Sequence, residues 1–125
     1  MTNENLPPLT DETLWAILND TIADATVNAL LWKGLGYGYD AEQGRWLTDQ
    51  VEAEWRLAYP EPPDFIDSRP AIVKLTRSIP SEHKQLLKEE LGFKGYRVDE
   101  LVPRKTRRAT AVNWLLSYRR AKLKF

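Results

Sequence analysis

The sequence of 125 residues contains no cysteine and a single histidine, His83. Without thiols it can form no disulfide and no thiolate-based metal or nucleophile site. It also lacks any apolar run near the roughly 20 residues of a membrane-spanning helix, and its N-terminus lacks the basic and apolar regions of a signal peptide. We therefore expect a soluble, cytoplasmic protein with no metal and no cofactor.

Side chains that carry catalysis are also scarce. His83 stands in the expected first turn of a helix after a proline, where we expect it to face solvent. No nucleophile-elbow pattern accompanies it, so a catalytic triad is not predicted. Asp64 and Asp67 lack the dense alternating acids of a calcium loop, and a cap of the next helix by Asp67 or Ser68 explains these residues better. We predict no catalytic residue.

The composition provides enough material for one hydrophobic core. Apolar residues make up 42% of the chain, charged residues make up 29%, and five residues are tryptophan. We expect most of the tryptophans in the core, because they fall on separate elements beside apolar positions. A chain of this length is typical of one domain. We predict a single domain over residues 1–125, with a flexible lead-in over residues 1–8.

Apolar spacing and end signals predict a mainly helical fold. Glycines and aromatic residues around the sequence DAEQG predict a small β-hairpin over residues 35–47. Residues 70–79 are also compatible with a strand because Ile, Val and Thr favour extended packing, but we favour a helix. The fold class is a compact multi-helix domain with a small hairpin, with α+β as the alternative. Helices are expected over residues 10–19, 24–34, 48–59, 70–79, 81–92 and 106–121. Thr10 is the expected cap of the first and Thr48 or Asp49 that of the third. The fifth is expected to turn Leu86, Leu87 and Leu91 inward and to stop at Gly92, with Phe93 folding back on Leu87.

Four long strings resemble those of an uncharacterised family, a domain of unknown function from cyanobacteria and plastid-bearing organisms. They are LPPLTDETLWAILND, YPEPPDFIDSRPAIVKLTRSIP, KQLLKEELGFKGY and PRKTRRATAVNWLLSY. The resemblance covers nearly the whole chain. It implies a cyanobacterial-type cytosolic protein, and it implies no activity, catalytic residue or cofactor.

The charges are strongly separated along the chain although the net charge is zero. Residues 103–125 carry eight of the 18 Lys and Arg and no acid, which leaves ten basic against 18 acidic residues in residues 1–102. Clustered charge selects binding partners before detailed contacts form. The basic segment is therefore the main functional signal.

This segment reads as a docked helix with cations at both ends. Val112, Leu115 and Leu116, with Ala109 and Leu123, form one apolar face. The helix macrodipole explains the C-terminal cations, but it disfavours cations at the N-terminal end. The N-terminal cluster therefore needs a counter-charge, which either acids of this chain, such as those of the first helix, or an external anion can supply. The C-terminal group is Arg119, Arg120, Lys122 and Lys124, and the N-terminal cluster is Arg104, Lys105, Arg107 and Arg108.

Three functions remain open on this evidence. We favour a non-catalytic binding or accessory module that engages an acidic protein partner through the N-terminal cluster. RNA or DNA binding by the same cluster, with Trp114 or Tyr118 stacking on bases, is the alternative. An enzyme acting on an anionic small molecule near Asp67, Arg69 and His83 is the third. The sequence does not predict the oligomeric state.

Overall fold

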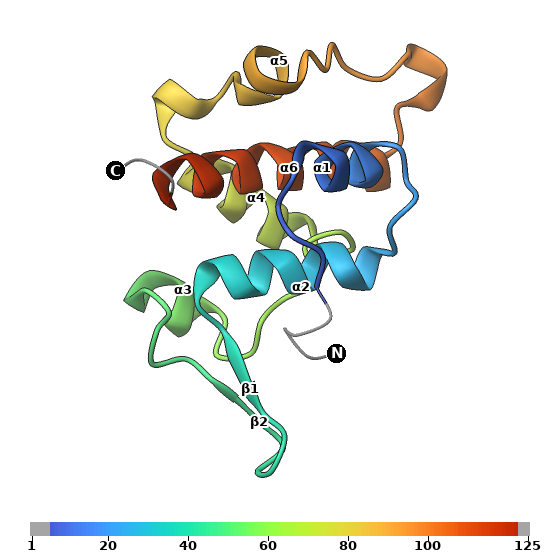
Figure 1. Ribbon diagram of the computed structural model, residues 1–125. Coiled ribbons are helices and arrows are strands. Elements are labelled where there is room, and N and C mark those ends of the chain that lie inside the picture. The colour runs from blue at the N-terminus through green and yellow to red at the C-terminus, as the bar shows by residue number, and fades with distance from the viewer. Residues whose placement is uncertain (1–5, 123–125) are drawn as a thin grey trace.

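The computed structural model describes residues 6–122, and the expected lead-in over residues 1–8 lies mostly outside them. Two short strands pair in antiparallel fashion, with Tyr39 opposite Trp46. They project as a hairpin from one end of the molecule (Figure 1). In order, the elements are α1 (Asp11–Leu18), α2 (Asp24–Leu35), β1 (Gly38–Asp40), β2 (Arg45–Leu47), α3 (Ala53–Ala58), α4 (Arg69–Ser78), the 3-10 turn η2 (Ser81–His83), α5 (Leu86–Leu91), the 3-10 turn η3 (Val98–Glu100) and α6 (Pro103–Lys122).

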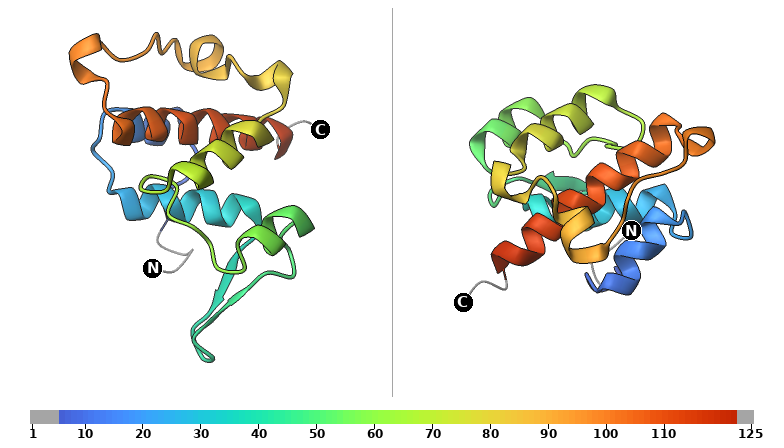
Figure 2. Two further views of the ribbon diagram at one scale, coloured as in Figure 1. Left: turned by 180° about the vertical axis from the view of Figure 1, so that it is seen from behind. Right: turned by 90° about the horizontal axis from the view of Figure 1, so that it is seen from above.

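Helix α6 is the central element of the fold. It packs against α1, α2, α4 and α5, and the views from behind and above show these segments arranged around it (Figure 2). Val112, Leu115 and Leu116 are fully buried, as expected for the apolar face of this helix. Leu123, which was assigned to the same face, lies outside the described residues. The basic helix is thus docked along its length.

The core unites residues from segments far apart in the sequence. Leu14 of α1, Val27 of α2, Leu75 of α4 and Leu86 of α5 are all inaccessible to solvent. Trp55 is buried with them, and the other four tryptophans pack partly buried against this core. The predicted fold class, a mainly helical domain with a small hairpin, is confirmed. No helix within residues 6–122 is long and apolar enough to cross a membrane.

Two helices begin at the residues that the sequence indicates. The Thr10 hydroxyl accepts a hydrogen bond from the Thr13 N–H at 3.2 Å, which caps α1. The Ser68 hydroxyl accepts one from the Ala71 N–H at 3.3 Å, which caps α4. Side-chain oxygens at these positions satisfy backbone N–H groups that have no partner within the helix. Residues 69–78 form α4, so the strand alternative for this segment is wrong.

Other helix limits differ from the prediction. Helix α2 ends at Gly36, whose φ of 104° is left-handed, and not at Gly34. Helix α3 begins at Ala53, later than a cap at Thr48 or Asp49 would place it. Helix α6 begins at Pro103 and not near residue 106, because proline at the first helical position has a preset φ and lacks only an N–H that would be unpaired there.

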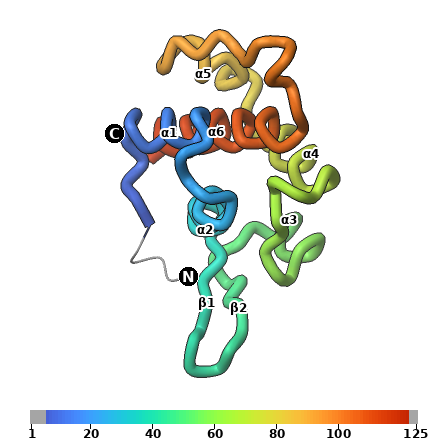
Figure 3. Tube along the Cα trace, turned by 90° about the vertical axis from the view of Figure 1, so that its right-hand side faces the viewer, coloured from blue at the N-terminus to red at the C-terminus, as the bar shows by residue number. Residues whose placement is uncertain are grey.

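The continuous helix predicted from Ser81 to Gly92 is wrong. The chain forms η2, interrupts its helix and resumes as α5, so that residues 81–102 lie over α6 as a strap (Figures 1 and 3). The Asn113 side chain of α6 holds this interruption: its Oδ1 accepts from the Leu87 N–H, and its Nδ2 donates to the His83 carbonyl, each at 3.1 Å. Gly92 does end α5 with a left-handed φ of 68°, as predicted.

Candidate functional site

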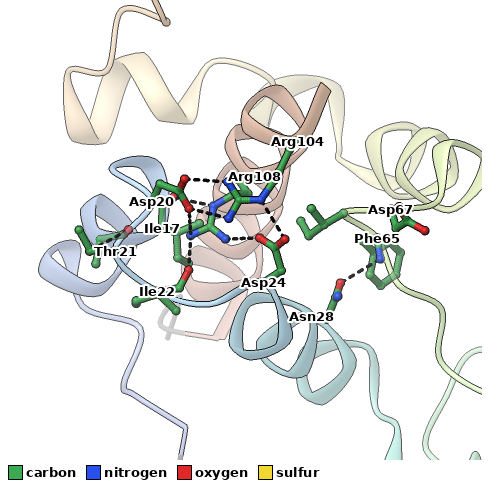
Figure 4. A network of polar contacts seen from close by, with 12 residues as sticks. Ile17, Asp20, Thr21, Ile22, Asp24, Asn28, Phe65, Asp67, Arg104 and Arg108 are labelled. Atoms are coloured by element: carbon green, nitrogen blue, oxygen red, sulfur yellow. Dashed lines mark hydrogen bonds and ion pairs between the residues drawn. The ribbon is translucent and has the colours of Figure 1, made fainter. Parts of the chain in front are cut away.

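Arg108 of the basic cluster lies in the interior, with 0% of the residue exposed. Its Nε donates to the carbonyl of Ile17 at 3.0 Å, and its Nη2 donates to that of Ile22 at 2.5 Å (Figure 4). Its Nη1 donates to Asp24 Oδ1 at 2.5 Å. A buried charge is tolerated only when it is paired and hydrogen-bonded. Arg108 meets that condition and joins the end of α1 to the start of α2.

Arg104 forms the outer part of the same network. Its Nη1 and Nη2 each donate to one oxygen of Asp20 at 2.7 Å, and its Nε donates to Asp24 Oδ2 at 3.0 Å. The hydrogen bond from Arg104 lowers the pKa of Asp20 below its ordinary value, despite the opposing effect of burial. Asp20 itself has a left-handed φ of 62°, which asparagine and aspartate tolerate better than most residues.

Lys105 is engaged more loosely. Its Nζ lies 3.9 Å from Glu100 Oε2 and 5.7 Å from the centroid of the Tyr96 ring. The carboxylate belongs to η3, the turn that leads into α6. A partly exposed pair at this distance contributes little to stability, so Lys105 has an internal partner that binds it weakly.

Arg107 differs from its three neighbours. Its Nη1 donates to the carbonyls of Ile66 and Asp67 at 2.9 and 3.2 Å. Within residues 6–122, no carboxylate oxygen lies within 4.0 Å of its guanidinium group. Arg107 is therefore held in place by backbone acceptors and keeps its charge uncompensated by the described acids.

The four residues of the predicted anion-facing patch lie in different surroundings. Arg104 and Arg108 meet acids at the end of α1 and the start of α2, so an internal source of counter-charge is present. Arg108 faces the interior and not an outside ligand, because the residue is fully buried and its three nitrogens donate to acceptors of this chain. Whether the cluster binds an external anion stays a prediction, and Arg107 is the member best placed for it.

A groove runs beside Arg107, between α4 and the start of α6. Its volume is about 600 Å³, and Arg69 and Arg107 both line it. Leu101 and Val102, which precede α6, are 53% and 46% exposed. The apolar residues of its lining are Ile72, Val73, Leu101, Val102 and Pro103. The groove thus combines exposed aliphatic side chains with two guanidinium groups.

Trp114 and Tyr118 stack on each other, with ring centroids 5.6 Å apart and planes inclined by 11°. Lys122 Nζ lies over the Tyr118 ring, 5.5 Å from its centroid, and Trp114 Nε1 donates to Ser78 Oγ at 3.1 Å. The two rings thus bind each other and α4. Their predicted role in stacking on nucleic-acid bases stays a prediction.

His83 was predicted to face solvent, but its ring also contacts helix α6. Its Nδ1 lies 2.7 Å from the Oγ of buried Ser117, so the imidazole fastens η2 to α6. It also lines a hollow of about 820 Å³. The other lining residues are Leu9, Asp11, Glu82, Glu90, Arg119 and Arg120. Asp67 and Arg69 are not among them, so the three residues of the enzyme hypothesis do not form one site.

The cations near the C-terminal end of α6 also meet acids. Arg119 Nη1 lies 2.9 Å from Asp11 Oδ1, and its Nη2 lies 3.2 Å from Glu90 Oε1. Arg120 Nη2 lies 3.0 Å from Glu90 Oε2. The helix macrodipole was the predicted reason for these cations, and ion pairs to α1 and α5 add to it.

A signal for the burial of Arg108 was present in the sequence. Arg108, Val112 and Leu115 have i, i+4 and i+7 spacing, which places them on one face of a helix. Because this face is the apolar one, Arg108 was separable from Arg107 before the structure. No comparable signal predicts the groove, since Leu101 and Val102 meet α4 only in three dimensions.

Together, the fold and the internal ion pairs define a class: a small, mainly helical domain built around one basic helix. The chain belongs to the family described as domain of unknown function (DUF1823), which it matches over residues 8–120. This confirms the predicted resemblance to an uncharacterised family. No curated protein matches the sequence.

A solved structure supports the same fold. It is a solution NMR structure of a protein that is 68% identical, and the alignment covers 90% of this chain and 94% of that chain. The TM-score is 0.80. The two proteins therefore share the arrangement of helices over most of their length.

Proposed function

We propose that this protein is a non-catalytic module that binds another protein through the groove between α4 and the start of α6. The observation that carries the proposal is the coexistence in one groove of half-exposed Leu101 and Val102 with Arg69 and Arg107. Aliphatic side chains exposed next to a guanidinium group that lacks a carboxylate are typical of surfaces that a partner covers.

The rest of the basic cluster favours a protein over a nucleic acid as the ligand. Arg104 and Arg108 are committed to Asp20 and Asp24, so few cations remain for a phosphate backbone. Nucleic-acid surfaces bind several phosphates along a continuous basic stripe. An apolar groove with two guanidinium groups instead fits an acidic and partly apolar protein segment.

The experiment compares capture by the wild-type protein and by two variants that each place an acid at an exposed aliphatic residue. Val102→Asp changes the groove, whereas Leu57→Asp changes α3, where Leu57 is 80% exposed and does not line the groove. We expect a partner in native lysate that wild type and Leu57→Asp capture equally and that Val102→Asp captures about tenfold less. Equal thermal midpoints would establish that both variants are folded. An identical set of captured proteins for all three would reject the proposal.

A further inference from the structure

We infer that the partner presents an Asp or Glu side chain to Arg107, next to an aliphatic side chain that enters the groove. This inference rests on the proposed function, because it specifies what the groove recognises. Arg107 would bind the carboxylate through two parallel hydrogen bonds, and Arg69 would add a second positive charge on the same groove.

The guanidinium group of Arg107 is oriented before any ligand binds. Its Nη1 is held by the carbonyls of Ile66 and Asp67, at 2.9 and 3.2 Å. Its Nε and Nη2 have no acceptor within the part of the chain that the structure describes. These two nitrogens form one planar edge of the group, and that edge matches the two oxygens of a carboxylate. A side chain already fixed loses less conformational freedom on binding.

The neighbouring cations cannot take this role. Arg104 already binds Asp20 through both terminal nitrogens at 2.7 Å, and Arg108 is buried. An incoming carboxylate would have to displace those acids, whereas Arg107 has no acid among residues 6–122 within 4.0 Å for it to displace. The single oriented fork therefore selects an acidic residue at one position of the partner.

The aliphatic lining determines what must accompany the acid. Leu101 and Val102 leave about half of their surface in water beside Arg107. Covering this apolar surface is favourable, and a phosphate or a nucleotide sugar gives no comparable cover. A partner segment that alternates an acid with Leu, Ile, Val or Phe satisfies both parts of the groove.

The test uses a phage library of random peptides of about 12 residues, which is long enough to fill a groove of this kind. The full-length protein is the bait, and selected peptides are then measured by fluorescence anisotropy. We expect an Asp or Glu next to an aliphatic or aromatic residue in the enriched sequences. Arg107→Gln should weaken binding about tenfold, whereas Arg97→Gln, at an exposed arginine in the turn before the groove, should not.

A second measurement leaves the protein unaltered and changes the peptide. Replacing its acid by the matching amide should weaken binding to wild type about tenfold, and should change binding to Arg107→Gln much less. Two results would overturn this inference and leave the proposed function standing. The first is that peptides whose binding is weakened by Val102→Asp carry no acid. The second is that Arg107→Gln does not change their affinity. If no selected peptide binds less tightly to Val102→Asp, both the inference and the proposed function are overturned. Both are also overturned if no peptide binds while a single-stranded RNA binds in a way that Arg107→Gln weakens.

Discussion

Arg108 is a charged residue at a position that helical spacing assigns to the core. An aliphatic side chain there would bury more apolar surface, but it would remove the three hydrogen bonds that Arg108 donates to the Ile17 and Ile22 carbonyls and to Asp24 Oδ1. Unpaired buried acceptors cost more than an average hydrogen bond contributes. The residue is therefore best understood as a structural bridge that fixes how α1 turns into α2.

We predict that Arg108→Ala lowers the free energy of unfolding by about 3–5 kcal/mol, because it removes a fully buried side chain together with its three hydrogen bonds and its ion pair with Asp24. Arg104→Ala should cost much less, since its side chain remains 44% exposed in the ion pair. Urea unfolding of both variants, followed by circular dichroism, measures the difference. Equal losses would show that the burial of Arg108 has no energetic consequence.

The Asp64 side chain stabilises the turn that precedes α4. Its Oδ1 accepts from Asn28 Nδ2 and from the N–H groups of Ile66 and Asp67, at 2.9, 2.9 and 3.0 Å. Burial alone would raise the pKa of Asp64, but these hydrogen bonds outweigh it and lower the pKa below its ordinary value of 3.8. The charged form is therefore the one that the folded protein prefers.

We predict a stability loss in acid to which Asp64 contributes. A carboxylate with a depressed pKa stabilises the fold above its unfolded pKa, and this contribution is lost as pH falls through the folded pKa. Urea midpoints should therefore fall from about pH 4 downward. Asp64→Asn keeps an acceptor oxygen and cannot titrate, so its midpoint should fall less steeply. An identical pH profile for the two proteins would contradict the assignment.

At the scale of elements, the contact of α2 with α6 depends on a residue that has no side chain. A Cβ on Gly34 would lie 2.7 and 2.9 Å from two carbons of the Trp114 ring. The predicted end of α2 at Gly34 was wrong because this glycine serves helix packing, whereas Gly36 supplies the left-handed turn. Sequence alone does not distinguish these two uses of glycine.

We predict that Gly34→Ala lowers the free energy of unfolding by about 1–3 kcal/mol, because overpacking displaces the Trp114 ring. Gly38→Ala is the matched control, since its Cβ would meet Leu47 at ordinary contact distances of 3.9 and 4.0 Å. Urea unfolding and tryptophan fluorescence measure both variants. If Trp114→Leu removes most of the cost of Gly34→Ala in the double variant, the clash is its cause.

The strap of residues 81–102 shows a second limit at this scale. Its leucine spacing and Gly92 stop were read correctly, and Phe93 N–H does return to the Leu87 carbonyl at 3.1 Å. The break between η2 and α5 was not expected, because the Asn113 groups that stabilise it come from α6. A side chain distant in sequence has overridden local helix preference.

For the whole molecule, much of the separation of charge along the chain is cancelled by folding. The basic ends of α6 lie against acids from α1, α2 and α5. What remains near the start of α6 is the groove with Arg69 and Arg107. This distribution favours a local contact over long-range attraction to a polyanion.

We predict that any binding of a single-stranded RNA of about 20 nucleotides is weak and depends little on salt. If only Arg69 and Arg107 meet phosphates, the slope of log affinity against log salt should be no steeper than about −1.4. Engagement of the whole cluster of four would instead give about −3. Anisotropy titrations between low and physiological salt measure the slope, and a value near −3 would show that the internal ion pairs open for the ligand.

The sequence by itself determined the elements of this protein. Caps such as Thr10 and Ser68, the hairpin turn, the Gly92 stop and the apolar face of α6 are local signals, and local physics suffices to read them. The helical class and the docking of the basic helix followed from these signals. The family resemblance followed from the four long strings.

Only the tertiary structure decided which charges remain available. Helical spacing places Arg108 on the apolar face, but the groups that pair Arg104 and Arg108 and orient Arg107 are acids and carbonyls some 40 to 90 positions away, brought close by the packing of α6 on α1, α2 and α4. The groove likewise arises where Leu101 and Val102 meet α4. Long-range contacts leave no fixed spacing in a sequence, because loops of many lengths can close them at similar entropic cost. The four-residue basic cluster of the sequence thus becomes three internally paired residues and one oriented guanidinium group beside a groove.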